Sequence, residues 1–218
     1  MSSFFKIDGP LMRGLSELTN LVILNILTVV CSLPVFTAGA AITSMHYCIM
    51  KMSDDEDSHL VQMFFTQFKD NFKTMTPAWL LFLAFGVFLY FDYQVFVVSA
   101  DTVRTVALVL IYAALIIYMA IYVWFFPMAA RFENGFLSKF KNAFYMAIGA
   151  LPRTLGMMVI WVVVVFVLSQ SLRLMPIFAL FGLSLPAYLS AFLYYPVIKK
   201  QIKVIRGEDD EDDDNLTD

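Results

Sequence analysis

Charged side chains are scarce in this chain, and their scarcity excludes an ordinary soluble domain. Asp, Glu, Lys and Arg make up only 15% of the 218 residues, whereas 60% are hydrophobic. Soluble domains contain roughly 45–50% apolar residues. No Asp, Glu, Lys or Arg occurs between Glu17 and Lys51. Because a protein in a bilayer keeps its charges where the chain leaves the hydrocarbon, this pattern indicates one membrane domain, residues 1–206.

Cysteine, histidine and catalytic motifs are equally sparse. The two cysteines, Cys31 and Cys48, fall near the inner end of the first apolar segment, where thiols stay reduced, so we expect no disulfide. There is no phosphate-binding loop, dinucleotide fingerprint or Gly-x-Ser-x-Gly elbow. His46 and His59 flank a cluster of acids, but their spacing fits no zinc or calcium pattern. We therefore expect no enzyme, no metal and no cofactor. The absence of a basic stripe with interleaved aromatics also argues against nucleic acid.

Five apolar segments are long enough to cross a bilayer core, which needs about 20 helical residues. They are residues 18–35, 77–98, 103–126, 155–172 and 175–195. Gly182 and Pro186 interrupt the fifth segment, which predicts a kink packed against a neighbour. Asn20 and Asn25 in the first segment are expected to form hydrogen bonds across helices. The sequence thus predicts an all-α polytopic membrane protein, with amphipathic cytosolic helices in its two long loops.

Acidic residues are concentrated at one place in the chain. Residues 207–218 contain eight of the 18 Asp and Glu, so the rest of the chain has 15 basic and 10 acidic residues, a balance of +5. A dense run of like charges repels itself and cannot bury a core. We expect a disordered acidic tail here, and the alternative is a segment with a specific electrostatic partner.

The two long loops each contain phenylalanines spaced by four, in the pattern Phe-x-x-x-Phe-Lys-x-x-Phe. One set is Phe64, Phe68 and Phe72, and the other is Phe132, Phe136, Phe140 and Phe144. Residues four apart share a helical face, so each set predicts a phenylalanine stripe on an amphipathic helix. Such a stripe packs against the protein's own helices or lipid headgroups, or alternatively docks a partner. The shared pattern also indicates a weak internal repeat.

A few polar residues are predicted at membrane depth. They are Asp92, Gln94, Arg104, Gln170 and Arg173. An ionised carboxylate in a span is costly and needs a partner, and Arg104 or Arg173 could reach Asp92 from the neighbouring turns between spans. Structural pairing is the simpler interpretation. The alternative is that these residues line a path for a proton or solute.

Ten short motifs follow one another in the first three quarters of the chain. In chain order they are Phe4-Phe5, Gly9-Pro10, Cys31-Ser32-Leu33-Pro34, Gly39-Ala40, Phe64-Phe65, Phe68-Lys69-Asp70-Asn71-Phe72-Lys73, Phe126-Pro127, Ala130-Arg131-Phe132, Lys141-Asn142-Ala143 and Leu151-Pro152-Arg153-Thr154. Together they resemble the YesL family of bacterial membrane proteins, from residue 4 to about residue 156. The resemblance implies an association with carbohydrate ABC importers and implies no catalytic residues.

A second similarity concerns the loop by which sugar-importer permeases dock their ATPase. Ala129-Ala130, Glu133-Asn134-Gly135 and Leu151-Pro152 are similar to that loop, although the glycine-to-proline spacing is about one helical turn too long. The sequence thus favours an accessory or assembly subunit of a carbohydrate ABC importer, with permease or ATPase subunits as partners. The alternatives are a small transporter or channel, and a membrane scaffold or sensor that recruits cytosolic proteins.

The charge pattern also predicts the orientation in the cell membrane. Eleven of the 15 Lys and Arg fall on one side of the five segments, which places the N-terminus outside and the C-terminus in the cytosol. Single-cysteine variants Ser2→Cys and Asn215→Cys, made without the two native cysteines, test this. In intact cells an impermeant maleimide should label only the first. Labelling of position 215 from outside contradicts the topology.

Overall fold

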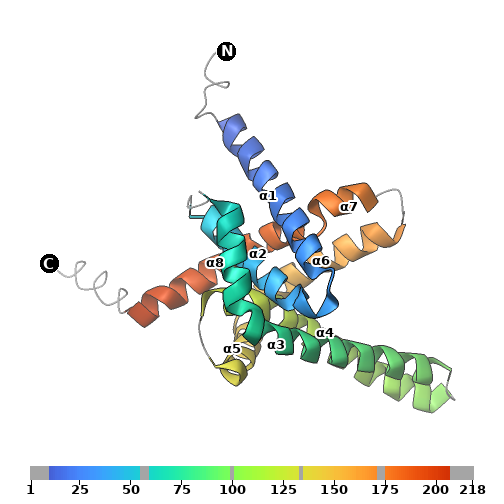
Figure 1. Ribbon diagram of the computed structural model, residues 1–218. Coiled ribbons are helices and arrows are strands. Elements are labelled where there is room, and N and C mark those ends of the chain that lie inside the picture. Colours follow the sequence, from blue (N-terminus) through green and yellow to red (C-terminus); the bar gives the residue numbers. More distant parts are fainter. Residues whose placement is uncertain (1–9, 55–58, 99–100, 133–134, 171–174, 207–218) are drawn as a thin grey trace.

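The computed structural model describes residues 10–54, 59–98, 101–132, 135–170 and 175–206, and within these ranges the chain is helical apart from short turns. The elements are α1 (Pro10–Ser32), η1 (Val35–Thr37), α2 (Ala38–Met52), α3 (Leu60–Val97), α4 (Asp101–Arg131), α5 (Phe136–Gly149), α6 (Leu151–Gln170), α7 (Met175–Phe181) and α8 (Ser184–Arg206) (Figure 1). The all-α prediction is confirmed. The acidic tail and Arg173 lie outside the described residues.

Helix α2 forms the hub of the molecule. It packs against α1, α3, α4 and α8, and twelve of its 15 residues are buried. The sequence places this stretch in the long connection after the first apolar segment and does not reveal its burial. Its small residues allow close packing, because a Cβ added to Gly39 would lie 2.5 Å from Trp79 Cβ.

Helices α3 and α4 form a long hairpin. The first half of α3 runs antiparallel to α2, since Gly39 lies against Met75 and Cys48 lies against Leu60. The second half of α3 and most of α4 then project together, away from the two ends of the chain (Figure 1). The expected span began at Pro77, but the helix is continuous from Leu60.

The sequence predicts five spans, but fewer helices in the structure are long and apolar enough to cross a membrane. Among the described residues, three helices are long and apolar enough: Gly14–Ser32, Leu60–Val97 and Thr102–Arg131. A fourth exists if α5 and α6 are counted as one span, although they meet at a bend of 100°. The fifth expected segment is divided between α7, which has only 7 residues, and α8.

Aromatic rings connect the hairpin to α5. Phe82 of α3 is almost fully buried and lies at the centre of this cluster. Its ring centroid is 5.1–5.8 Å from those of Tyr118, Tyr122, Phe125, Phe126 and Phe140. Aromatic pairs at such separations contribute roughly 0.5–1.5 kcal/mol each beyond simple burial. The cluster therefore fixes α5 against the base of the hairpin.

A hydrogen-bond chain holds the sharp bend between α5 and α6. Trp124 Nε1 of α4 donates to Thr154 Oγ1 at 2.8 Å, and Thr154 Oγ1 donates to the Ala147 carbonyl at 3.0 Å. All three groups are buried. Because α4, α5 and α6 are joined at one hydroxyl, α5 is held across the end of α6 instead of continuing it.

Asn25 of α1 closes the break between α7 and α8. Its Nδ2 donates to the carbonyls of Phe178 (3.3 Å) and Ala179 (2.7 Å). Its Oδ1 accepts from the backbone N–H of Leu183 (2.8 Å) and of Ser184 (3.0 Å). Helix ends leave such groups without partners, and in a bilayer water does not supply them. The expected cross-helix hydrogen bond of Asn25 and the expected break at Gly182 are thus one feature.

We predict that Asn25→Leu strongly destabilises the protein. The change removes the side-chain partner of the Ala179 carbonyl and of the Leu183 and Ser184 N–H groups, and each unsatisfied buried group costs about 1–3 kcal/mol. Thermal unfolding in detergent should show a large drop in the midpoint. Thr28→Val is the matched control, because Thr28 is equally buried in α1 and donates only to the Leu24 carbonyl of its own helix at 2.7 Å. Equal losses for both variants would contradict the role of Asn25.

Candidate functional site

The phenylalanine stripe of α5 faces the interior at its centre. The Phe140 ring lies 4.4 Å from Phe125 and 5.3 Å from Phe82, centroid to centroid. Phe132 packs against the core, whereas Phe136 and Phe144 are partly exposed at the edges of the stripe. Intramolecular packing, the simpler expectation, therefore describes Phe140 and Phe132.

The stripe at the start of α3 is also internal. Phe64 is fully buried, and its ring stacks on that of Phe68 at 6.4 Å. Phe68 in turn lies 5.9 Å from Phe72, and both pack against the core. Phe64 thus contributes to the hub and offers no surface on which a partner can dock.

A second apolar face of α5 points outward, and we call it the α5 ridge. It consists of Leu137, Phe144, Tyr145 and Ile148, and Leu137 is 80% exposed. The sequence analysis did not identify this ridge apart from Phe144. The signal was present, because positions 137, 144 and 148 also have helical spacing. With apolar residues on two faces of one helix, the sequence does not say which face is covered.

A groove lies beside the ridge, between α5 and the last turns of α8. It has a volume of about 540 Å³ and we call it the α5–α8 groove. Its lining residues are Met128, Phe132, Asn142, Tyr145, Met146, Gln201 and Val204. Gln201 Nε2 lies 3.3 Å from Met146 Sδ, which connects the two walls. The groove is mostly apolar, with one amide side chain on each of the two helices.

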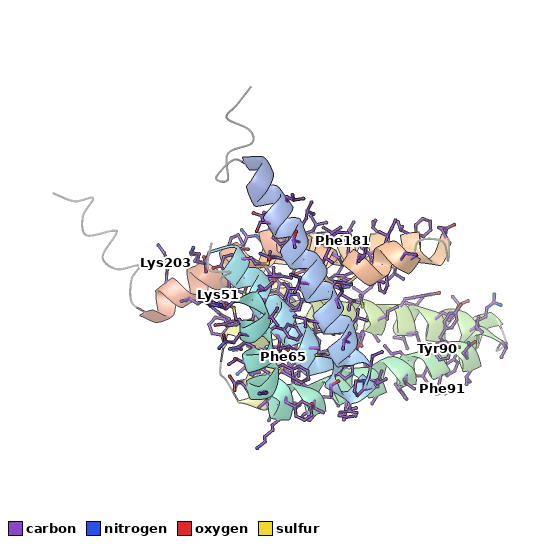
Figure 2. All side chains as sticks on the ribbon, turned by 45° about the horizontal axis from the view of Figure 1, so that its top comes forward. Lys51, Phe65, Tyr90, Phe91, Phe181 and Lys203 are labelled. Atoms are coloured by element: carbon purple, nitrogen blue, oxygen red, sulfur yellow. The ribbon has the colours of Figure 1, made fainter. Side chains whose placement is uncertain are left out.

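Three basic residues lie near lining residues of the groove, one by contact and two by position in α8. Lys141 Nζ lies 5.7 Å from the centroid of the Tyr145 ring, a cation–π geometry at the groove wall. Lys200 and Lys203 are exposed on α8, close to Val204 in the sequence. Figure 2 shows Lys51 and Lys203 at one end of the molecule, whereas Tyr90 and Phe91 lie along the hairpin that projects from the other end. This polarity is the one that a membrane protein requires.

Asp54 is an acidic residue whose contacts are described at this basic end. It accepts a hydrogen bond from the Tyr195 hydroxyl, and Lys199 Nζ lies 3.2 Å from its Oδ1. Burial raises the pKa of the Asp54 carboxyl. The hydrogen bonds from Tyr195 and Lys199 and the charges of Lys199 and Arg131 together lower this pKa by more than burial raises it. The pKa therefore lies below its ordinary value. This contact joins the end of α2 to α8.

The polar residues expected at membrane depth are not brought together as pairs. Gln94 Nε2 donates to the Tyr90 hydroxyl at 2.8 Å, within α3. In the described part of the chain, no hydrogen bond or ion pair joins Asp92 to Arg104 or to Gln170. Arg104 and Gln170 are exposed. These residues therefore do not form a continuous polar path in the described structure.

A further contact joins α1 to α8. The Tyr188 hydroxyl donates to Glu17 Oε2 at 2.9 Å. The sequence places Glu17 just beyond the outer end of the first span, but Tyr188 near the middle of the fifth. In the structure the two side chains nevertheless meet, and together with the hydrogen bonds that Asn25 accepts from Leu183 and Ser184 they hold α1 against the start of α8.

His46 has a structural environment that the sequence did not reveal. It lies in the hub, fully enclosed, and its Nδ1 is 3.0 Å from the Tyr194 hydroxyl of α8. Both residues are buried, and their rings meet edge to face at 5.6 Å. No group of three His, Cys, Asp or Glu within the described ranges is arranged to hold a metal ion. His46 therefore connects α2 to α8 in the described structure.

These features define an all-α polytopic membrane protein with a buried α2 and a helix, α5, held across one end. Residues 21–93, about a third of the chain, match the family described as "Protein of unknown function, DUF624". The matched stretch holds most of α1, all of α2 and most of α3, so it covers the hub but not α5 or α8. No curated protein and no solved structure matches the chain.

We predict that the stabilising contribution of Asp54 depends on pH. Because its pKa is lower in the folded chain than in the unfolded chain, the carboxylate contributes stability above about pH 4. That contribution is lost as the pH falls through the folded-state pKa. Asp54→Asn should thus lower the thermal midpoint at pH 7, and the difference from the wild type should shrink below about pH 4. Asp70→Asn, an exposed carboxylate on α3, is the control, and an equal pH-dependent effect there would contradict the assignment.

Proposed function

We propose that the protein is a non-catalytic accessory or assembly subunit of a membrane complex, and that it binds its partner through the α5 ridge. The observation that carries this proposal is the position of α5. The helix is fixed across the end of α6 by the Trp124–Thr154–Ala147 chain and by the Phe82 cluster. Its outer face nevertheless presents large apolar side chains. An apolar face on a rigidly held helix is suited to docking a second protein.

The proposed partner is a permease or ATPase subunit of a carbohydrate ABC importer. The support is the resemblance to the YesL family, together with the match of residues 21–93 to DUF624, a family that includes YesL-like membrane proteins. This support is a likeness and not a contact, so the partner's identity is a proposal. The loop similar to an importer docking loop spans Ala129 to Pro152, which includes all of α5.

The ridge and groove are proposed to face the cytosol. The Lys and Arg count favours this orientation, and the structure groups predicted cytosolic residues with one another. Asp54 follows the first apolar segment, Arg131 follows the third and Lys199 follows the fifth, and the charges of Arg131 and Lys199 both act on Asp54. These contacts are the ones expected if all three connections emerge on one side of the membrane.

A transporter that works alone is the rival function. Its support would be convergence of polar residues at membrane depth, and Asp92, Arg104 and Gln170 are not joined in the described structure. We therefore expect Asp92→Asn to leave sugar uptake by the host cell nearly unchanged. The purified protein should not move solute across liposome membranes. If it does, and if Asp92→Asn abolishes this movement, the protein is a transporter and the accessory proposal is wrong.

The docking prediction is that Leu137→Asp with Ile148→Asp reduces co-purification with permease subunits at least about tenfold, because each charge is placed in the apolar contact. Phe140→Asp is unsuitable as a test, since Phe140 is part of the aromatic cluster and its replacement would unfold the site. Affinity purification from native membranes followed by mass spectrometry measures the effect. Unchanged size-exclusion profiles should show that both variants fold.

Val61→Asp with Phe65→Asp is the matched control. Both residues are exposed, apolar and one helical turn apart on the first half of α3. This variant should co-purify with the partner as the wild type does. Retention of the partner by the α5 variant, or an equal loss in the control, would contradict docking through the ridge.

A further inference from the structure

The α5–α8 groove has an apolar floor and a basic border, and this combination selects its occupant. Met128, Phe132, Met146 and Val204 form the apolar lining, while Asn142 and Gln201 supply amides. Lys141 stands over Tyr145 on one wall. An occupant that complements this surface carries negative charges together with at least one apolar side chain. We propose that residues 207–218 of this same chain occupy the groove.

Position along the chain supports this occupant. Gln201 and Val204 line the groove, and α8 ends at Arg206, so the acidic segment begins three residues beyond the groove wall. A chain of twelve residues extends at most about 40 Å. The 14 residues of α5 are about 21 Å long. The segment is therefore long enough to follow the groove over its whole length.

Charge complementarity supports it as well. Residues 207–218 carry eight acids, and the remainder of the chain has a balance of +5. Lys200 lies one helical turn before Val204 and thus on the same face of α8, and Lys141 stands on the α5 wall. One exposed ion pair contributes only about 0–1 kcal/mol. A short tether, however, holds the acids at millimolar effective concentration, so several weak pairs act together.

The composition of the segment supplies the apolar contact. Leu216 is its single large apolar residue and follows Gly207 by nine positions. In the proposed arrangement the acids lie along Lys141 and Lys200, and Leu216 enters the apolar floor of the groove. Because Tyr145 belongs to both the groove and the α5 ridge, the docked segment also covers part of the ridge. The segment thereby competes with any protein that binds there.

The test measures groove accessibility in the full-length chain without any partner, so its outcome is independent of the importer proposal. Val204→Cys places a thiol on the groove wall, in a chain that carries Cys31→Ala and keeps the buried Cys48. Maleimide labelling is followed in a non-ionic detergent at low salt. Neutralising all eight acids of residues 207–218 to Asn and Gln should raise the labelling rate about fivefold, the factor that a few weak ion pairs supply. High salt should have the same effect on the unmodified segment.

Leu137→Cys is the matched control, because Leu137 is exposed on α5 and does not line the groove. Its labelling rate should not change with the charge of the segment. Leu216→Asp should raise the rate at position 204 while leaving the eight acids in place, which separates apolar docking from simple attraction.

Two outcomes overturn the proposal. The first is an equal labelling rate at position 204 with and without the eight acids. The second is protection that appears only when phosphatidylglycerol is added and persists after neutralisation, which would identify lipid headgroups as the occupant. A photo-crosslinker placed at Asn142 gives the direct measurement. It should form its adduct within residues 207–218, and an adduct located elsewhere in the chain would also contradict the docking.

Discussion

The structure depends on one side-chain amide, that of Asn25, which forms hydrogen bonds with the free backbone groups at the break between α7 and α8. In hydrocarbon, backbone N–H and C=O groups need partners within the protein, so an interrupted helix is permitted only where another side chain supplies them. Asn25 supplies both kinds of partner at once, accepting from Leu183 and Ser184 and donating to Phe178 and Ala179. This arrangement fixes α1 against the α7–α8 junction. It also allows the chain to change direction at Gly182, where a Cβ would collide with the Phe178 ring.

The hub of the molecule is built next to this junction. Helix α2 lies between α1, α3, α4 and α8, and its glycine and alanine residues bring the neighbouring backbones close. The His46–Tyr194 contact links it to α8. Beyond the hub, Thr154 joins α4, α5 and α6 and turns α5 across the end of the molecule. The α5 ridge and the α5–α8 groove depend on that turn, because the 100° bend between α5 and α6 brings α5 beside α8.

The two proposals concern the same end of the protein but different contacts. Docking of a partner uses the exposed ridge, whereas the acidic segment uses the groove beside it, and Tyr145 is common to both. Self-occupancy of this kind would make partner binding sensitive to salt and to cationic ligands that compete for the acids. It would also explain why a strongly acidic run follows directly on a strongly basic helix end, since an isolated run of either sign repels itself.

The sequence by itself determined that the protein lies in a membrane, that it is all-α and where its charges are located. Long uncharged apolar runs cannot fold stably in water, and Lys and Arg remain where the chain leaves the hydrocarbon, so these properties follow from composition and order alone. Asn25 and Gly182 were also recognisable as a polar residue and a break within apolar segments.

Tertiary structure alone decided which faces are covered. Phe140 and Leu137 lie on the same helix and are both large and apolar, yet only contacts with Phe82 and Phe125 decide that the first is inside and the second outside. The burial of α2 could not be predicted from the sequence either. Small residues and a histidine are weak signals of burial, and α2 is buried because four other helices surround it. That Asn25 meets the helix break beside Gly182, through Leu183 158 positions away, depends on a contact that no local pattern encodes.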